Sequence, residues 1–332
     1  RSPRRSALLV QARRWTWIFL TAAAVFAAAG CLSGALGDRW WAFEALWAFR
    51  VQYAWVLVVT AAAFAVGRRW LRCAIAGTFA FAAVLSFCDV WLEDPPPAAG
   101  PQWRALLLNV SSWNPGTAAV LDYIRKVDPD LMVLLEVTPK WMKALEPVRS
   151  AYPEVLADPR EDSFGIALFS RLPLADGRIV VADAGVPVIR AVLRDLGLAV
   201  FGLHAVPPIG GERLALRNAQ IDRLATLVRD TSKPVLVLCD LNAVPWSPAF
   251  ERLLQTTGLR DSRVGFGLQP TWQADSWLLA LPIDHALTSA DVLVHRREIG
   301  PDVGSDHRGV VVEFSFRDGG ERRPHRVEGG PR

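Results

Sequence analysis

The sequence is poor in cysteine, and its four cysteines leave little scope for disulfide bonds. Cys31, Cys73 and Cys88 fall in apolar runs of the first hundred residues, so Cys239 is the only cysteine after them. A domain formed by the later residues must therefore be stable on its hydrophobic core, without an internal disulfide. The sequence also lacks a cysteine cluster and a His-Glu-x-x-His motif, which disfavours a zinc site.

Two other motifs and one charge pattern are missing as well. There is no glycine-rich phosphate loop and no Gly-x-Ser-x-Gly motif, which argues against P-loop nucleotide hydrolases and serine esterases. Residues 1–100 contain ten Lys and Arg against five Asp and Glu, whereas residues 101–332 contain 27 against 28. The later part thus lacks the basic excess of a typical nucleic-acid-binding domain.

Apolar residues, in contrast, are abundant near the start of the chain. The 332 residues are 52% hydrophobic, with a mean hydropathy of +0.22. Three apolar runs predict transmembrane helices over about 15–37, 49–67 and 71–92, within a membrane region of residues 1–92. Eight of the fourteen tryptophans lie in the first hundred residues, several at the ends of these runs, where indole rings settle at the headgroup level.

Arginine distribution predicts the orientation of these helices. Five arginines precede the first run and three separate the second from the third, and cytoplasmic loops concentrate such residues. We therefore expect a multi-pass protein of the cell membrane, with a cytoplasmic N-terminus and an extracytoplasmic domain after the third run. Alternatively, residues 1–31 are a secretory signal, because Ala-Ala-Gly-Cys at 28–31 loosely resembles a lipoprotein processing site. Heavy use of arginine over lysine suggests a bacterial source with a GC-rich genome.

A proline-rich linker, residues 93–102, is expected to be stiff and extended. From residue 103 to 316, short apolar runs alternate with amphipathic stretches, which predicts a layered α/β sandwich. Helices are expected at 212–229 and near 247–255, and the tail, 317–332, is expected to be disordered. Buried strands are expected at 105–110, 131–135, 164–169, 187–194, 197–203, 234–239, 283–288 and 309–315.

Chemically capable side chains recur at the ends of these apolar runs. Each alone is more common as a turn, cap or structural residue, but their repeated position at strand ends favours a shared site. Asp240 and Asn242 are two residues apart, so both can face the same side. The set comprises Asn109, Glu136, His204, Asp240, Asn242, Asp284, Asp306 and His307.

The residue types in this set are those of phosphoester hydrolysis. Carboxylate and amide oxygens suit Mg²⁺, Mn²⁺ or Ca²⁺. A histidine with a carboxylate partner can activate water or protonate a leaving group. Asparagine and a second histidine can hold phosphate oxygens while charge redistributes.

The order Asn, Glu, Ser-Arg, His, Asp-x-Asn, Asp-His and Ser-Asp-His resembles the endonuclease/exonuclease/phosphatase family over residues 103–316. The most specific segments are Leu-Cys-Asp-Leu-Asn at 238–242 and Gly-Ser-Asp-His-Arg-Gly at 304–309. The resemblance implies a four-layer α/β sandwich, with two central mixed sheets flanked by helices. Here about three transmembrane helices would precede it.

The resemblance also implies residue roles and a cofactor, Mg²⁺ or Mn²⁺. Glu136, Asn109 and Asp306 would hold the metal. His307, oriented by Asp284, would be the general acid or base, and Asp240 would position or activate the water. The scissile phosphate would be held by Asn242 and His204.

One departure from the family pattern concerns a second metal. Several nuclease members carry an acidic residue two positions after the first Asn, where this chain has Ser111; this difference weakens a second metal site and leaves a single-metal mechanism open. Arg190 and Arg217 are candidate phosphate contacts, although solvated or sheet-edge positions are equally compatible with them. Trp272 also falls where relatives often have a similar residue.

Membrane helices followed by such a domain are similar to membrane-anchored bacterial members of the family, including the type associated with teicoplanin resistance. We therefore expect a divalent-metal-dependent phosphoesterase that contacts the lipid bilayer. Its substrate would be lipid-linked, such as a phospholipid or a polyprenyl-phosphate cell-wall intermediate. One alternative is an extracytoplasmic endo- or exonuclease, although the net charge of −1 after residue 100 disfavours nucleic acid. The other is a non-catalytic, ligand-binding resistance module.

Overall fold

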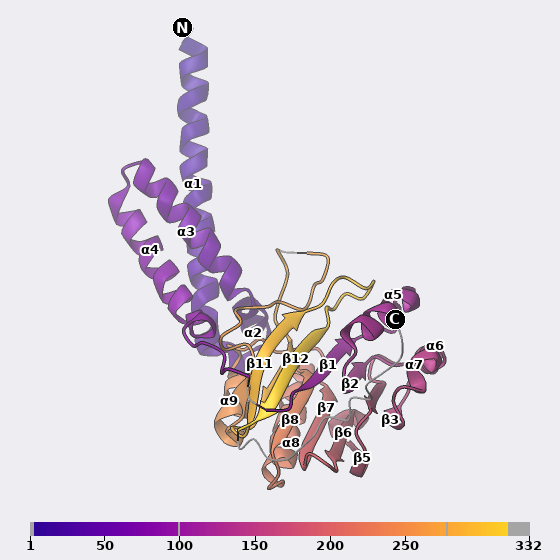
Figure 1. Ribbon diagram of the computed structural model, residues 1–332. Coiled ribbons are helices and arrows are strands. Elements are labelled where there is room, and N and C mark those ends of the chain that lie inside the picture. Colours follow the sequence, from indigo (N-terminus) through magenta and orange to yellow (C-terminus); the bar gives the residue numbers. More distant parts are fainter. Residues whose placement is uncertain (1–2, 99, 277, 318–332) are drawn as a thin grey trace. The chain divides into compact units, whose positions relative to one another are not determined.

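The computed structural model describes residues 3–98, 100–276 and 278–317, which form two compact units (Figure 1). The helical unit comprises Arg1–Asp89 and Trp246–Pro248, and the α/β unit comprises Val90–Pro245 and Ala249–Arg332. The predicted disordered tail, from residue 318 onwards, lies outside the described residues.

The helical unit is built from apolar sequence rich in alanine and aromatic residues. Its helices pack closely where side chains are small, as at Gly30, where a Cβ would lie 2.3 Å from the ring of Tyr53. Ala27, Leu57 and Phe64 are buried in the same core. The elements are α1 (Pro3–Ser33), η1 (Gly34–Arg39), α2 (Trp41–Ala48), α3 (Arg50–Val66), α4 (Trp70–Leu85) and η2 (Cys88–Trp91).

Among the described residues the structure has one or two candidate membrane spans by length and composition, and not clearly the three predicted. Val10–Gly37 is long and apolar enough to cross a bilayer, as an anchor or as a signal sequence. α2 and α3 would form a second span only together, and they are bent by 59°. α4 ends at Leu85 instead of continuing to residue 92. Its 16 residues reach about 24 Å, less than the roughly 30 Å hydrocarbon core.

The α/β unit contains two six-stranded sheets. The first has the order β11-β12-β1-β2-β4-β3, and the second has the order β5-β6-β7-β8-β10-β9. Both are mixed, because β1 and β2 are parallel, as are β7 and β8, while their other neighbours are antiparallel. The strands are β1 (Trp103–Asn109), β2 (Leu131–Leu135), β3 (Glu154–Asp158), β4 (Ile166–Ser170), β5 (Leu174–Val181), β6 (Pro187–Leu193), β7 (Leu198–His204), β8 (Val235–Asp240), β9 (Arg260–Asp261), β10 (Asp284–Thr288), β11 (Val292–Ile299) and β12 (Val310–Phe316).

Three hydrophobic cores hold the layers of this unit together. The central core joins the inner faces of the two sheets, with Leu107 and Val133 from the first and Val200 and Leu238 from the second. The other two cores cover the outer faces with helices. These helices are α5 (Thr117–Val127), α6 (Pro139–Ala144) and α7 (Glu146–Arg149) on the first sheet, and α8 (Gly211–Arg229) and α9 (Pro248–Thr257) on the second. The prediction of two mixed sheets flanked by helices is confirmed.

Buried elements match the sequence expectations better than half-exposed ones. The helices expected at 212–229 and near 247–255 are α8 and α9. The helix α5 and the strands β3, β5 and β11 were not expected. None of the three strands is a continuous buried run: β3 is half-buried throughout, β5 is mostly exposed, and β11 mixes buried, half-buried and exposed positions.

Strand register brings the candidate residues to the same level. His204, at the end of β7, pairs with Asp240 at the end of β8. Asp240 in turn pairs with Asp284 at the start of the antiparallel β10. The three side chains therefore stand in one row across adjacent strands. In the first sheet, Asn109 ends β1 beside Leu135, so Glu136 follows directly on the neighbouring strand.

The chain from Val90 into the proline-rich linker belongs to the α/β unit and contacts its other parts. The carbonyl oxygen of Val90 accepts hydrogen bonds from the backbone N–H groups of Gly265 (3.0 Å) and Gly267 (3.1 Å). His295 Nδ1 donates to the carbonyl oxygen of Pro96 at 2.9 Å. Both glycines have positive φ, and a Cβ on Gly267 would lie 2.8 Å from the indole nitrogen of Trp91. Val90 and Trp91 therefore pack closely against the loop that follows β9.

Candidate active site

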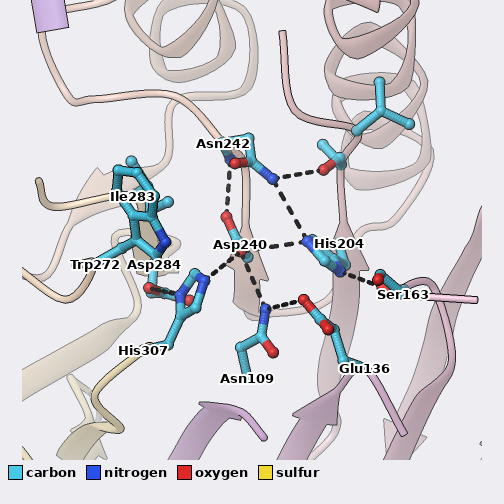
Figure 2. Close-up of polar contacts among 12 residues, drawn as sticks. Asn109, Glu136, Ser163, His204, Asp240, Asn242, Trp272, Ile283, Asp284 and His307 are labelled. Carbon is cyan, nitrogen blue, oxygen red and sulfur yellow. Dashed lines mark hydrogen bonds and ion pairs between the residues drawn. The ribbon is translucent and has the colours of Figure 1, made fainter. Parts of the chain in front are cut away.

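Asp240 is the centre of the polar network (Figure 2). Its side chain is fully buried at the end of β8, where the apolar strand Val235–Cys239 fixes its position. Oδ2 lies 3.4 Å from His204 Nε2, 3.8 Å from His307 Nε2 and 3.5 Å from Asn109 Nδ2. Oδ1 accepts the backbone N–H of Asn242 at 2.9 Å. Groups from four segments of the chain therefore converge on one carboxylate.

Glu136 and Asn109 meet at the ends of the parallel strands β1 and β2. Asn109 Nδ2 donates to Glu136 Oε1 at 3.0 Å, while Asn109 Oδ1 accepts the N–H of Ser111. Glu136 Oε2 accepts both the N–H (3.0 Å) and the hydroxyl (2.9 Å) of Ser112. Glu136 itself has φ +59°, an unfavourable conformation for a residue with a side chain, of the kind that structures hold at functional sites.

His204 and Asn242 form the side of the site next to β7. His204 Nδ1 donates to the carbonyl oxygen of Ser163 at 2.8 Å, which leaves Nε2 facing Asp240 and Asn242. Phe164 packs on the imidazole ring, with centroids 5.4 Å apart. Asn242 Nδ2 donates to the carbonyl oxygen of Ala205 at 2.9 Å, so its position is fixed relative to β7.

The two arginines considered as phosphate contacts have other partners. Arg217 is fully buried and donates to the carbonyl oxygen of Asn242 at 3.0 Å, so it holds the turn that carries Asn242. Arg190 is paired with Asp176 across β5 and β6 at 2.6 Å.

His307 and Asp284 form a buried imidazole–carboxylate pair on the opposite side. His307 Nδ1 donates to Asp284 Oδ2 at 2.8 Å. The backbone of His307 is fixed by Ser305, whose hydroxyl accepts its N–H and donates to the carbonyl oxygen of Asn109. The second oxygen of Asp284 is buried without a hydrogen-bond partner in the described chain. The pair therefore directs Nε2 of His307 toward Asp240.

Burial and neighbouring charges shift the pKa values of these groups in different directions. Burial and the negative charge of Asp284 raise the pKa of Asp240 to about 6, against the opposing effect of the two histidines. Burial alone would lower the pKa of His307, but Asp284 and Asp240 outweigh it and raise this pKa to about 10. Burial would raise the pKa of Asp284, yet His307 holds it below its ordinary value. The imidazole is thus cationic and Asp240 is a carboxylate of raised basicity.

The pKa of Glu136 is lowered. Burial opposes this shift, but the positive charge available at His204 and the hydrogen bonds from Ser112 and Asn109 outweigh it. Glu136 therefore stays ionised, as a cation ligand requires.

Asp306 lies at the exposed edge of the site. Its Oδ2 accepts the indole N–H of Trp272 at 3.2 Å, and the backbone of Trp272 forms an isolated bridge with His307. Within the described chain, no hydrogen bond or ion pair joins Asp306 to Glu136 or Asn109. The structure thus brings Glu136 and Asn109 into contact and leaves Asp306 on the side of Trp272.

A buried ionic cluster lies behind Asp284. Asp261 is paired with Arg263 at 2.6 Å, and both side chains are almost inaccessible. Arg297 is buried too, and its guanidinium donates to the hydroxyl of Ser262 and to the carbonyl oxygen of Asp284. Burial lowers the pKa of Arg297 to about 9, so it remains cationic near neutral pH. This cluster places positive charge behind the carboxylates of the site.

The donor set fits a hard divalent cation. Glu136 is ionised and only half-buried, and a carboxylate has more acceptor positions than its present hydrogen bonds use. Asp240, Asp284 and His307 also lie close enough together to hold a metal ion. In that group, however, Asp284 and His307 are already bonded to each other, which favours an acid–base role.

All the predicted catalytic residues belong to one contact network. His307 and Asp284 are paired, and Asp240 contacts His307, His204 and the backbone of Asn242. Sequence reasoning missed Ser112 and Arg297. Ser112 had a usable signal, because it lies three residues after Asn109, within reach of the next strand end. Arg297 had none, because it occupies an alternating, half-exposed strand.

Comparisons with known proteins bear on the family and the fold of the α/β unit. Residues 106–307 match the model of the endonuclease/exonuclease/phosphatase family. No curated protein matches the sequence. Among solved structures, D. rerio TDP2 complexed with single-strand DNA product is 15% identical, with a TM-score of 0.55 over 65% of this chain and 99% of that chain. The human Nocturnin catalytic domain with bound sulfate anion is 19% identical, with a TM-score of 0.53 over 66% and 96%.

A third similar structure comes from a bacterium. The endonuclease/exonuclease/phosphatase from Bacteroides vulgatus is 18% identical, with a TM-score of 0.54 over 65% of this chain and 99% of that chain. At these identities the likeness shows the fold, and the family match covers well over half of the chain. The chain therefore belongs to the endonuclease/exonuclease/phosphatase family, whose name denotes the hydrolysis of phosphoesters.

Proposed function

We propose that this protein is a membrane-anchored, divalent-metal-dependent phosphoesterase that acts on a membrane-associated substrate. The observation that carries the proposal is the position of Asp240. It is a buried carboxylate with a pKa raised to about 6, and it lies within 4 Å of two imidazoles. A base, a cationic acid and hydrogen-bond donors are thus assembled around one point.

The chain's own residues divide the reaction between them. Asp240 holds the attacking water and accepts its proton as the water oxygen bonds to phosphorus. His307, kept protonated by Asp284, donates a proton to the leaving oxygen as the bond from phosphorus to that oxygen breaks. Asn242 and His204 donate hydrogen bonds to the phosphate oxygens as negative charge redistributes.

Glu136, Asn109 and Asp306 would hold the cation, Mg²⁺ or Mn²⁺. Glu136 and Asn109 are in contact, and Asp306 lies at the exposed edge of the same site, beside Trp272. When bound, a divalent cation would neutralise charge on the phosphate group. One cation suffices on this proposal, since Ser111 offers no carboxylate and its carbonyl oxygen accepts the indole N–H of Trp141.

An apolar rim supports a membrane-associated substrate. From Trp103 onwards, the exposed large hydrophobic side chains of the described α/β unit are few. Trp113 (88% exposed), Ile209 (68%), Leu278 (55%) and Leu279 (47%) lie on the loops that follow Asn109 and His204 and precede Asp284. These four residues form the apolar rim, and the fifth such residue, Val181, lies elsewhere. Exposed apolar residues gathered on site loops mark surfaces that contact apolar ligands or membranes.

The arrangement of the rest of the chain is consistent with this proposal. Val10–Gly37 could anchor the protein in a bilayer, and the α/β unit would then be extracytoplasmic, as the arginine distribution predicts. In this arrangement of membrane helices followed by the α/β domain, the sequence resembles membrane-anchored bacterial members of the family. Phospholipid head groups and polyprenyl-phosphate intermediates are the substrates of suitable chemistry.

The test uses the full chain in lipid nanodiscs with Mg²⁺ or Mn²⁺. Release of phosphate or of a head group is measured from a polyprenyl pyrophosphate and common phospholipids, with DNA cleavage measured in parallel. We expect release from a lipid substrate, lost on chelation and in His307→Ala. His295→Ala is the matched control, because His295 contacts Pro96 and Ser315 outside the site.

Each other outcome contradicts part of the proposal. Cleavage of DNA alone would make the protein a nuclease and remove the lipid substrate. Metal binding without turnover of any phosphoester would make it a ligand-binding module. Lipid hydrolysis that persists in His307→Ala would remove the assigned acid.

A further inference from the structure

The helical unit contains a cavity of about 440 Å³ that the catalytic chemistry does not use. It lies among α1, the turn between α3 and α4, and the start of α4, three helices that run side by side (Figure 1). Four arginines line it, Arg13 and Arg14 from α1 and Arg69 and Arg72 from the start of α4. No acidic residue lines it, so it concentrates positive charge.

Two of the guanidinium groups are held in place by neighbours. Arg69 stacks on the ring of Trp17, 4.4 Å from its centroid, and Arg72 donates to the hydroxyl of Thr21 at 2.8 Å. In the described chain, none of the four cavity arginines forms an ion pair with a carboxylate. Their mutual repulsion is therefore uncompensated, and an anion bound among them would relieve it.

The backbone around the cavity is shaped to allow this convergence. A Cβ on Gly67 would lie 2.1 Å from the indole ring of Trp17, so only glycine lets that ring pack beneath the turn. Arg69 precedes the first residue of α4 and provides no side-chain cap, so the first N–H groups of that helix keep their positive potential. Helix end and guanidinium groups thus favour the same anionic ligand, and planar guanidinium groups suit phosphate oxygens.

Neighbouring residues indicate which kind of molecule would carry the anionic group. Trp15 (62% exposed) directly follows the cavity residue Arg14, and the exposed pair Trp70 (66%) and Leu71 (75%) lies between the cavity residues Arg69 and Arg72 along the chain. Tryptophan with basic residues at the ends of apolar helices marks the level of lipid head groups. We propose that this cavity binds the phosphate group of an anionic membrane lipid. The inference uses the proposed membrane location of the helical unit and is independent of the catalytic site.

The test measures lipid binding to the full chain in detergent by native mass spectrometry, with a chelator present so that turnover does not contribute. The probes are phosphatidylglycerol, phosphatidylcholine and a diacylglycerol with the same chains, and inorganic phosphate is added separately. We expect the Kd of phosphatidylglycerol to be at least about tenfold lower than the Kd of either other lipid. A difference of this size corresponds to at least one hydrogen bond to a charged group. Arg69→Gln combined with Arg72→Gln should remove the preference.

Controls separate a built site from general attraction to positive charge. Arg39→Gln removes an exposed arginine of η1 that does not line the cavity, and it should leave the preference unchanged. Gly67→Ala should weaken phosphatidylglycerol binding without any change of charge, because it displaces Trp17. An equal loss in Arg39→Gln, or equal binding of all three lipids, would overturn the proposal. Inorganic phosphate that binds as tightly as phosphatidylglycerol would overturn the lipid assignment in favour of a soluble anion.

Discussion

Asp240 and Asp284 are direct cross-strand partners on β8 and β10, two buried carboxylates on the same row of one sheet. Like charges so placed repel each other, and the cationic ring of His307 between them offsets the repulsion. Because the ring bonds to Asp284 and only approaches Asp240, it lowers the pKa of the first while that of the second is raised to about 6. One carboxylate thus holds the protonated imidazole, and the other can accept a proton.

Asp284→Asn should remove most of the activity without removing the fold. The amide cannot compensate the charge of His307, so the pKa of the imidazole should fall and the ring should lose its fixed direction. We expect kcat to decrease by about 10²- to 10⁴-fold, the usual contribution of a positioned acid or base. The measurement is hydrolysis of a soluble phosphodiester over a range of pH. Asp275→Asn, at an exposed loop position, is the control, and a wild-type kcat in Asp284→Asn would contradict the assignment.

Ser112→Ala should weaken metal binding moderately. The substitution removes the hydroxyl that donates to Glu136 Oε2 at 2.9 Å but keeps the backbone N–H. Residues that orient a metal ligand contribute about 10- to 100-fold in affinity, and Glu136→Gln should cost more. Titration calorimetry with Mn²⁺ gives the affinities. Ser163→Ala should behave as wild type, because only the backbone carbonyl of Ser163 contacts the site. Equal affinities in wild type and Glu136→Gln would show that the cation binds elsewhere.

The α/β unit should lose stability in mild acid through His285. Burial lowers the pKa of this histidine to about 4, and its Nε2 donates to the carbonyl oxygen of Ala243 at 2.9 Å. Below about pH 6.5 the unfolded chain takes up a proton that the folded state refuses, so stability falls as pH drops toward 4. The slope should reach about 1.4 kcal/mol per pH unit from this residue alone.

Urea unfolding of the full chain in detergent at several pH values measures this dependence. In His285→Gln the amide can still donate to Ala243 but does not titrate, so the slope between pH 6.5 and 4 should become shallower. An unchanged slope would assign the acid sensitivity to other groups.

Trp113→Ser should affect lipid substrates alone. The exposed indole contributes apolar contact with a bilayer or an acyl chain, and its removal should raise KM for a vesicle substrate by about tenfold. The kinetics with a soluble phosphodiester should not change. Val181→Ser, which removes an exposed apolar residue away from the site loops, is the matched control. If soluble and vesicle substrates lose activity equally, Trp113 supports the site structurally and the apolar rim does not bind lipid.

The parts that could be predicted from the sequence are those with short-range signals. Apolar runs such as Leu131–Leu135 and Val235–Cys239 form strands because they are buried on both faces, and the polar residue after each run marks the site. The pairing of Asp240 with both His204 and Asp284 depends on sheet order, which joins strands far apart in the chain. Arg297 shows the limit most clearly, since its burial depends on packing against Ser262 and Asp284 and leaves no local pattern.

The pairing of β1 with β12 bears on how the protein matures (Figure 1). β12 lies inside the first sheet, between β1 and β11, although it is the last strand along the described chain. During synthesis β1 can therefore pair with β12 only after more than two hundred further residues have been made. His307 precedes this strand by three residues, so its side chain can join the site only when β12 has been added to the sheet. A nascent chain released early would contain Glu136 and Asp240 without activity, and folding of the domain would be completed only after translation reaches residue 316.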